Sequence, residues 1–129
     1  LPEAARLLGG AEATTLEAAE AQGRALLALG PRAVLMKGGH ASGDTCTDLL
    51  IRPDAETVRL SAPRVATINT HGTGCTYSAT IAAHLALGAD MEMAVMAAHA
   101  YLQGAIRAAD ELTIGAGHGP VHHFHEIWV

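Results

Sequence analysis

Apolar residues recur at helical spacing in the first third of the chain. The stretch "PEAARLL" predicts a short helix over residues 2–8, with Pro2 in its first turn and Gly9-Gly10 after its end. The stretch "TLEAAEAQGRALLALG" predicts a second helix, which Gly30-Pro31 stops. Thr14 and Glu17 have the spacing of a capping box, so we expect this second helix to begin at Thr14.

The same periodicity returns in the second half of the chain. One helix is predicted from about residue 76 to 87, ending at Gly88. Another is predicted to begin after Asp90, whose carboxylate would cap it, and to continue to about Ile106. Because the joint between them is very short, we expect these two helices to pack as neighbours.

Short apolar runs predict strands between the helices. Residues 33–36 form a continuous apolar run before a polar residue and two glycines, which is typical of a buried strand in a parallel sheet. Residues 45–52 predict a second strand, and residues 57–65 a third with a turn at Ala62-Pro63, so that a short hairpin could cover an edge. The alternation of strand and helix favours a layered α/β fold.

Composition narrows the class of protein. Half of the 129 residues are hydrophobic and only 3% are aromatic, which predicts a core of small and aliphatic side chains in one domain. The net charge of -5, without a basic cluster, argues against nucleic-acid binding, and no apolar run reaches transmembrane length. Cys46 and Cys75 are expected to be free thiols in a reducing cytoplasm. The chain begins with Leu1 rather than methionine, so we expect a fragment or a processed chain.

The most distinctive stretch is "NTHGTGCTYSATIAAHLALG", in which a glycine-rich turn leads directly into a helix. The first backbone N–H groups of a helix have no partner and carry partial positive charge, and glycines let a ligand approach them closely. Gly72-Thr73-Gly74-Cys75 therefore predicts an anion-binding turn suited to phosphate. The same location favours the thiolate of Cys75 as a base or nucleophile, with a buried structural cysteine as the alternative.

Other polar residues carry weaker signals. Lys37, the only lysine, ends a buried strand before two glycines, where it could reach a phosphate or simply be solvated. The tail holds four histidines, at positions 118, 122, 123 and 125, but no partner with metal-site spacing, so a functional metal there is the less favoured interpretation. We assign no role to Asp48.

These stretches together resemble a known family. "VLMKGGH", "DLL", the glycine-turn stretch, "AHAYLQGAIRAA" and "GHGPVHHF" occur in the order seen in the C-terminal half of hydroxymethylpyrimidine/phosphomethylpyrimidine kinases, of the ribokinase-like superfamily. The resemblance implies a three-layer α/β/α fold with a mostly parallel sheet, of which this chain is the C-terminal half. Residues 1–129 would then be part of a single kinase domain whose N-terminal, substrate-binding half is absent.

The resemblance also implies roles for individual residues. Cys75 would be the catalytic base, and the anion hole would consist of Gly72, Thr73 and Gly74. Lys37 and Gly38 would lie near the phosphates of ATP, with Thr70 beside the anion hole. Glu3 would match the glutamate that holds Mg²⁺ through water in an Asn-x-x-Glu motif, whose asparagine would precede Leu1.

The implied function is ATP-dependent phosphorylation of hydroxymethylpyrimidine and its monophosphate in thiamine biosynthesis, by a cytoplasmic homodimer. The substrate would be a small pyrimidine, without a nucleic-acid or membrane partner, and this segment alone is expected to be inactive. A pyridoxal kinase-like enzyme is the alternative within the superfamily. A non-catalytic half-domain that acts as a binding or assembly module is the alternative from another class.

Overall fold

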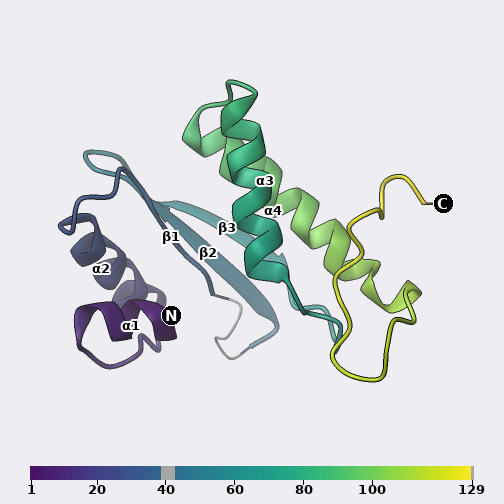
Figure 1. Cartoon of the computed structure of the whole chain (residues 1–129). Coiled ribbons are helices and arrows are strands. Elements are labelled where there is room, and N and C mark those ends of the chain that lie inside the picture. The colour runs from purple at the N-terminus through teal and green to yellow at the C-terminus, as the bar shows by residue number, and fades with distance from the viewer. Residues whose placement is uncertain (39–42, 129) are drawn as a thin grey trace. The chain divides into compact units, whose positions relative to one another are not determined.

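The computed structural model describes residues 1–38 and 43–128 of the chain. These residues form two compact units, Leu1–Arg64 and Val65–Val129. The first unit contains two helices and the three strands, and the second contains two long helices and the C-terminal segment (Figure 1).

The first unit begins with two short helices. Helix α1 spans Pro2–Leu8 and ends at Gly9, which adopts the left-handed conformation, as the sequence predicted. Helix α2 spans Leu16–Leu27 and is capped by Thr15, whose hydroxyl accepts the N–H of Ala18 at 3.1 Å. The prediction of Thr14 as the cap was therefore wrong by one residue. Because the cap is Thr15, Glu17 stands one position too early to complete a capping box.

Three strands form a sheet in the order β1-β2-β3. Strand β1 spans Val34–Met36, β2 spans Thr45–Ile51 and β3 spans Val58–Pro63, and both pairings are antiparallel. The expected parallel arrangement is thus not found among the described strands. Only residues 37–44 separate β1 from β2, and a parallel crossover needs a dozen residues or more. The predicted turn at Ala62-Pro63 was also wrong, because these residues continue β3 opposite Cys46 and Thr45.

The core of the first unit lies between these helices and the sheet. On β2, Leu49 and Ile51 are fully buried and point toward the helices. Helix α2 lies very close to the strands at Gly23, where an added Cβ would overlap the side chains of Ile51 and Met36. The buried cluster consists of Ala4, Ala13, Ala19, Leu26, Met36, Leu49 and Ile51. This small-residue core agrees with the alanine-rich composition.

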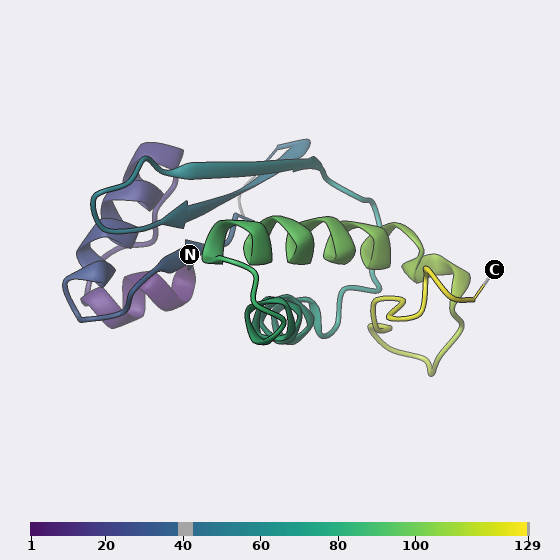
Figure 2. The same ribbon diagram turned by 90° about the horizontal axis from the view of Figure 1, so that it is seen from above.

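The second unit is built on a helical hairpin. Helix α3 spans Thr73–Ala86 and helix α4 spans Met91–Arg107, followed by the short 3₁₀ helix η1, Ala109–Glu111. Asp90 caps α4 as predicted, because its Oδ1 accepts the N–H of Met93 at 2.8 Å. In Figure 2, α3 is seen end-on while α4 runs across the view, so the helices cross where they pack. The buried face of α4 includes three alanines, which let the helices approach closely (Ala94, Val95, Ala98, Leu102 and Ala105).

The C-terminal segment returns along α4. The N–H of His122 donates to the carbonyl of Ala105 at 2.9 Å, and the Tyr101 hydroxyl donates to the carbonyl of His123 at 2.6 Å. Gly104 provides room for this segment, since an added Cβ would overlap the ring of His125. Of the helices in the described ranges, none is long and apolar enough to cross a membrane.

Candidate active site

The glycine-rich turn forms the beginning of α3. Helix α3 starts at Thr73, whereas the sequence predicted a start at about residue 76. Thr73, Gly74 and Cys75 therefore make up its first turn. Gly72 precedes the helix with φ 85° and ψ 3°, a left-handed conformation that glycine adopts without the steric cost of a Cβ. Within the described part of the chain, no side chain caps this helix and its first turn has no acidic residue. The N–H groups of Gly74 and Cys75 are therefore available to an anion, whereas the N–H of Thr73 is donated to the carbonyl of Thr70.

Side chains around the first turn leave the thiol of Cys75 exposed. Thr76 is buried, and its hydroxyl lies 3.0 Å from Nε2 of His123. The hydroxyl of Ser78 donates to the carbonyls of Gly74 at 3.0 Å and Cys75 at 3.1 Å. Cys75 itself is a free cysteine on the surface, so the expectation of a free thiol is confirmed and the buried structural interpretation is wrong. In its deprotonated form, the exposed sulfur of Cys75 beside the first turn of the helix can receive a proton from a hydroxyl bound there.

Thr70 and His71 connect the turn to the preceding segment. The carbonyl of Thr70 accepts the N–H of Thr73 at 3.4 Å, which places Thr70 directly beside the turn as predicted. The backbone of His71 forms a parallel bridge with Pro120, through an N–H···O bond to Gly119 at 3.1 Å. His71 therefore contributes to the turn through its backbone.

In the first unit, Lys37 and Gly38 directly follow β1. Lys37 is exposed, whereas Gly38 is buried and donates its N–H to Oδ1 of Asp48 at 2.8 Å. Gly38 also lies so close to β2 that an added Cβ would overlap the carbonyl oxygen of Thr47. Asp48, which the sequence left without a role, therefore fixes the backbone next to Lys37. The residues that follow, 39–42, include the rest of the "KGGH" stretch and lie outside the described residues.

Glu3 lies in the first turn of α1 with an exposed carboxylate. Its pKa is lowered from the ordinary value of 4.5, first by hydrogen bonding to its own backbone. The positive charge of Lys37 lowers the pKa slightly further. The carboxylate is therefore ionised at neutral pH and faces solvent, as a metal ligand acting through water requires.

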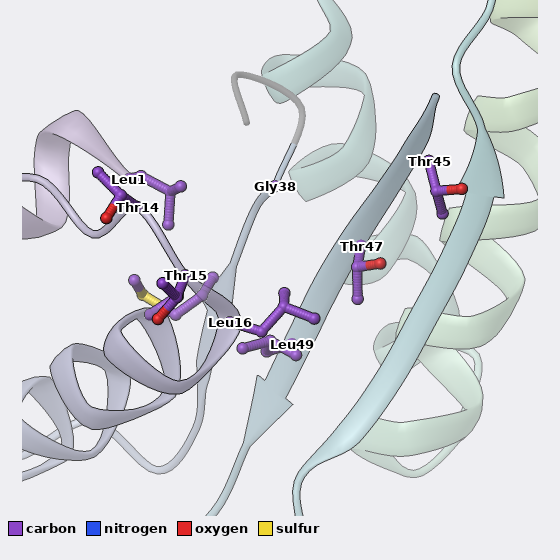
Figure 3. Close-up of a pocket in the computed structure, with 10 residues that line it drawn as sticks. Leu1, Thr14, Thr15, Leu16, Gly38, Thr45, Thr47 and Leu49 are labelled. Carbon is purple, nitrogen blue, oxygen red and sulfur yellow. The ribbon is translucent and has the colours of Figure 1, made fainter. Parts of the chain in front are cut away.

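A cavity of about 300 Å³ lies beside Gly38 in the first unit (Figure 3). Its threonine hydroxyls are partly engaged: Thr15 caps α2, and the hydroxyl of Thr47 is turned toward β3, where it lies 2.9 Å from that of Ser61. Leu16 and Leu49 form an apolar part of the wall. The lining residues are Leu1, Thr14, Thr15, Leu16, Ala19, Met36, Gly38, Thr45, Thr47 and Leu49.

The histidines of the tail have structural contacts rather than a shared ligand. His122 is buried and its Nδ1 accepts the N–H of Phe124 at 3.2 Å, while His123 contacts Thr76. Among the residues that the structure describes, no three His, Cys, Asp or Glu side chains are grouped so that they could hold a metal ion.

Sequence comparison identifies the family. Residues 1–122 match the family described as phosphomethylpyrimidine kinase. The chain belongs to this family. It is 52% identical over 128 residues to the hydroxymethylpyrimidine/phosphomethylpyrimidine kinase of Rhizobium meliloti, an alignment that covers 99% of this chain and 48% of the relative. The chain thus spans about half the length of the curated relatives it matches, and the resemblance expected from the glycine-turn stretch is confirmed.

Solved structures show the same fold. The ADP complex of Bacillus subtilis pyridoxal kinase superposes with a TM-score of 0.88 at 30% identity, covering 96% of this chain and 46% of that chain. The Staphylococcus aureus pyridoxal kinase in complex with AMP-PCP and pyridoxal gives a TM-score of 0.89 at 27% identity, covering 97% of this chain and 46% of that chain. The α/β fold of this phosphomethylpyrimidine kinase family member is therefore that of the pyridoxal and phosphomethylpyrimidine kinases.

Proposed function

We propose that the protein containing this chain transfers the γ-phosphoryl group of ATP to the hydroxymethyl group of hydroxymethylpyrimidine, and then a second phosphoryl group to the monophosphate, in thiamine biosynthesis. The observation that carries this proposal is the uncapped start of α3, where Gly72 is left-handed and the Cys75 thiol is exposed. Membership in the phosphomethylpyrimidine kinase family and the nucleotide complexes of similar pyridoxal kinases support it.

The proposed chemistry takes place at the first turn of α3. The N–H groups of Gly74 and Cys75 point toward the transferred phosphoryl group and stabilise the charge spread over its oxygens. The Cys75 thiolate accepts the proton of the attacking hydroxyl as the new P–O bond forms. Thr70 supports the turn through its carbonyl bond to Thr73.

We propose that Lys37, Gly38 and Glu3 serve the nucleotide. Lys37 supplies a positive charge to the ATP phosphates, and Gly38 lets the backbone at the end of β1 approach them. The ionised, solvent-facing carboxylate of Glu3 fits a Mg²⁺ ion held through water, since Mg²⁺ prefers oxygen ligands and keeps several waters. When bound, the metal neutralises part of the phosphate charge.

The intact enzyme is proposed as a cytoplasmic homodimer with a three-layer α/β/α domain. Residues 1–129 belong to one such domain, and the part of the relatives' length that this chain does not span supplies parallel strands and the pyrimidine pocket. The half-length alignment supports this arrangement.

The test uses the protein at the full length of its relatives. Purified enzyme is incubated with Mg-ATP and either hydroxymethylpyrimidine, its monophosphate or pyridoxal, and ADP release is measured with product mass. We expect kcat/KM to be highest for the two pyrimidines. ADP release that does not depend on either pyrimidine would contradict the proposal.

A pyridoxal kinase-like activity is the second candidate, because both solved structures named above are pyridoxal kinases. It predicts that pyridoxal has the highest kcat/KM in the same assay. A non-catalytic half-domain predicts no product with any acceptor. Residues 1–129 alone should be inactive under the first two proposals, since the acceptor pocket is absent from this segment.

A further inference from the structure

Asn69, three residues before the glycine turn, connects the turn to two distant segments. Its Oδ1 accepts the N–H of Gly119 at 3.0 Å, and its Nδ2 donates to Oδ1 of Asp110 at 2.9 Å and to the carbonyl of Ala109 at 3.4 Å. One amide group thus uses both its acceptor and its donor on segments that follow it by forty positions or more. This is the pattern of a tether between the segment that precedes α3, the 3₁₀ helix η1 and the tail.

Neighbouring residues strengthen this tether. The hydroxyl of Thr67 donates to the same Asp110 carboxylate oxygen and accepts the N–H of Asn69 at 3.0 Å. Position 119 has no room for a side chain, because a Cβ added at Gly119 would overlap the side-chain oxygen of Asn69. We name Thr67, Asn69, Asp110 and Gly119 the Asn69 clamp.

The clamp matters because the local support of the turn comes from backbone bonds, such as that from the Thr73 N–H to the Thr70 carbonyl at 3.4 Å, and not from a side-chain cap. The residue that precedes α3 is Gly72, and no side chain caps the helix within the described residues. The chain enters α3 through Gly72 directly from residues 67–71, which is the segment that the Asn69 clamp holds. The orientation of the first N–H groups therefore depends on contacts that come from η1 and from the tail.

We propose that Asn69 is a positioning residue for phosphoryl transfer: the Asn69 clamp sets the orientation in which the turn at Gly72–Cys75 meets the transferred group. This inference rests on the proposed function. A small displacement of charge-stabilising donors from their working geometry lowers the rate strongly even when binding is retained. Asn69 acts through the turn and does not itself touch the substrate.

The clamp requires an amide at position 69 specifically. Asparagine offers one acceptor to the Gly119 N–H and one donor to the Asp110 carboxylate. In Asn69→Asp the acceptor is kept, but the donor is replaced by an oxygen that faces a second carboxylate. In the double variant Asn69→Asp with Asp110→Asn the donor and acceptor exchange places, so the bond between the two side chains is restored.

The experiment compares these variants in the full-length enzyme. We expect Asn69→Asp to lower kcat by about tenfold or more with a smaller change in the KM for ATP. The double variant should recover at least half of the decrease in the logarithm of kcat. Glu111→Gln, which removes a neighbouring negative charge of the same 3₁₀ helix, is the matched control and should keep kcat within about twofold of wild type.

A second readout does not require activity. The rate of Cys75 alkylation by iodoacetamide, followed by peptide mass spectrometry, reports the environment of the thiol at the turn. It should change by about threefold or more in Asn69→Asp and return toward the wild-type value in the double variant. If the wild-type enzyme phosphorylates no pyrimidine, the proposed function fails, and alkylation alone decides whether the clamp positions the turn.

Two results would overturn the inference. One is an Asn69→Asp enzyme whose kcat and Cys75 alkylation rate both match the wild type. The other is a double variant no better than Asn69→Asp in either measurement. Should Asn69→Asp fail to fold, Gly119→Ala perturbs the same contact from the other side, and wild-type behaviour of that variant would equally overturn the clamp.

Discussion

The side chain of Asp48 holds the backbone of Gly38 through a buried N–H···O bond of 2.8 Å. Asp48 lies on β2 and Gly38 follows β1, so the bond links the end of one strand to the middle of the next. Because the Gly38 N–H is turned inward to this carboxylate, the path of the chain at Lys37 is fixed from within the sheet. The exposed lysine is thus presented from a rigid backbone.

Asp48→Ala should therefore weaken both stability and nucleotide binding. A buried N–H left without its charged acceptor costs about 1–3 kcal/mol of unfolding free energy. In the full-length enzyme the KM for ATP should rise, since the Lys37-Gly38 segment loses its support. Denaturant unfolding and initial-rate kinetics measure the two effects. Asp48→Asn keeps an acceptor oxygen and is the control, so equal losses in both variants would contradict this role.

Cys75→Ala tests the proposed base. Removing a general base lowers the rate by about a hundredfold to ten-thousandfold, whereas the uncapped N–H groups proposed to bind the phosphate remain. We expect kcat to fall far more than the KM for ATP changes, and Cys75→Ser to be intermediate or equally slow. Cys46→Ala removes the other thiol, in β2, as a control. An unchanged kcat in Cys75→Ala would rule out the assignment.

Gly72→Ala separates backbone strain from loss of function. Gly72 has φ 85° and Gly9 has φ 67°, and an added Cβ would meet no atom within 4 Å at either position. Each alanine substitution should cost about 1–2 kcal/mol through the left-handed backbone alone. Only Gly72→Ala should also lower kcat, because it alters the turn before α3, whereas Gly9 ends α1. Calorimetry and kinetics on both variants test this, and equal kcat values would argue against a working anion turn.

Acid stability should depend on Glu20. The pKa of this carboxyl is lowered from 4.5, first by the Thr57 hydroxyl at 2.5 Å and then by Arg24. Because the pKa is lower in the folded than in the unfolded protein, the ionised carboxylate stabilises the fold at every pH above the unfolded pKa. This stabilisation disappears as the pH falls through the folded pKa. The Tm difference between wild type and Glu20→Gln should thus be largest near neutral pH and shrink below pH 4.5.

Thr57→Val provides the matching control, because it removes the strongest contact of the Glu20 carboxylate. Melting curves from pH 7 to pH 3 should show how much Glu20→Gln changes the Tm in each background. The pH-dependent change in Tm should be smaller in the Thr57→Val background than in the wild type. A Tm difference that stays constant with pH would show that the carboxylate contributes through packing rather than through its charge.

Much of the local structure could be predicted from short stretches. Gly9 and Gly88 mark helix ends and Asp90 marks a helix start, because the backbone preference of glycine and the capping bond of aspartate act over a few neighbouring residues. The glycine turn before α3 was predicted for the same reason, and anion binding there stays a prediction. The Thr14 cap was wrong because two adjacent threonines offer equivalent capping groups, and packing selects between them.

The sequence by itself determined where helices and strands form and which family the chain resembles, since propensity, capping and the Gly-Thr-Gly-Cys turn are local properties. Only the tertiary structure decided the register in which β1 pairs with β2, because a short run of apolar residues is compatible with more than one register. It also decided that Asp48 supports Gly38 and that Asn69 meets Asp110. A side-chain hydrogen bond between residues 41 positions apart leaves no periodic signal, so folding alone brings the two groups together.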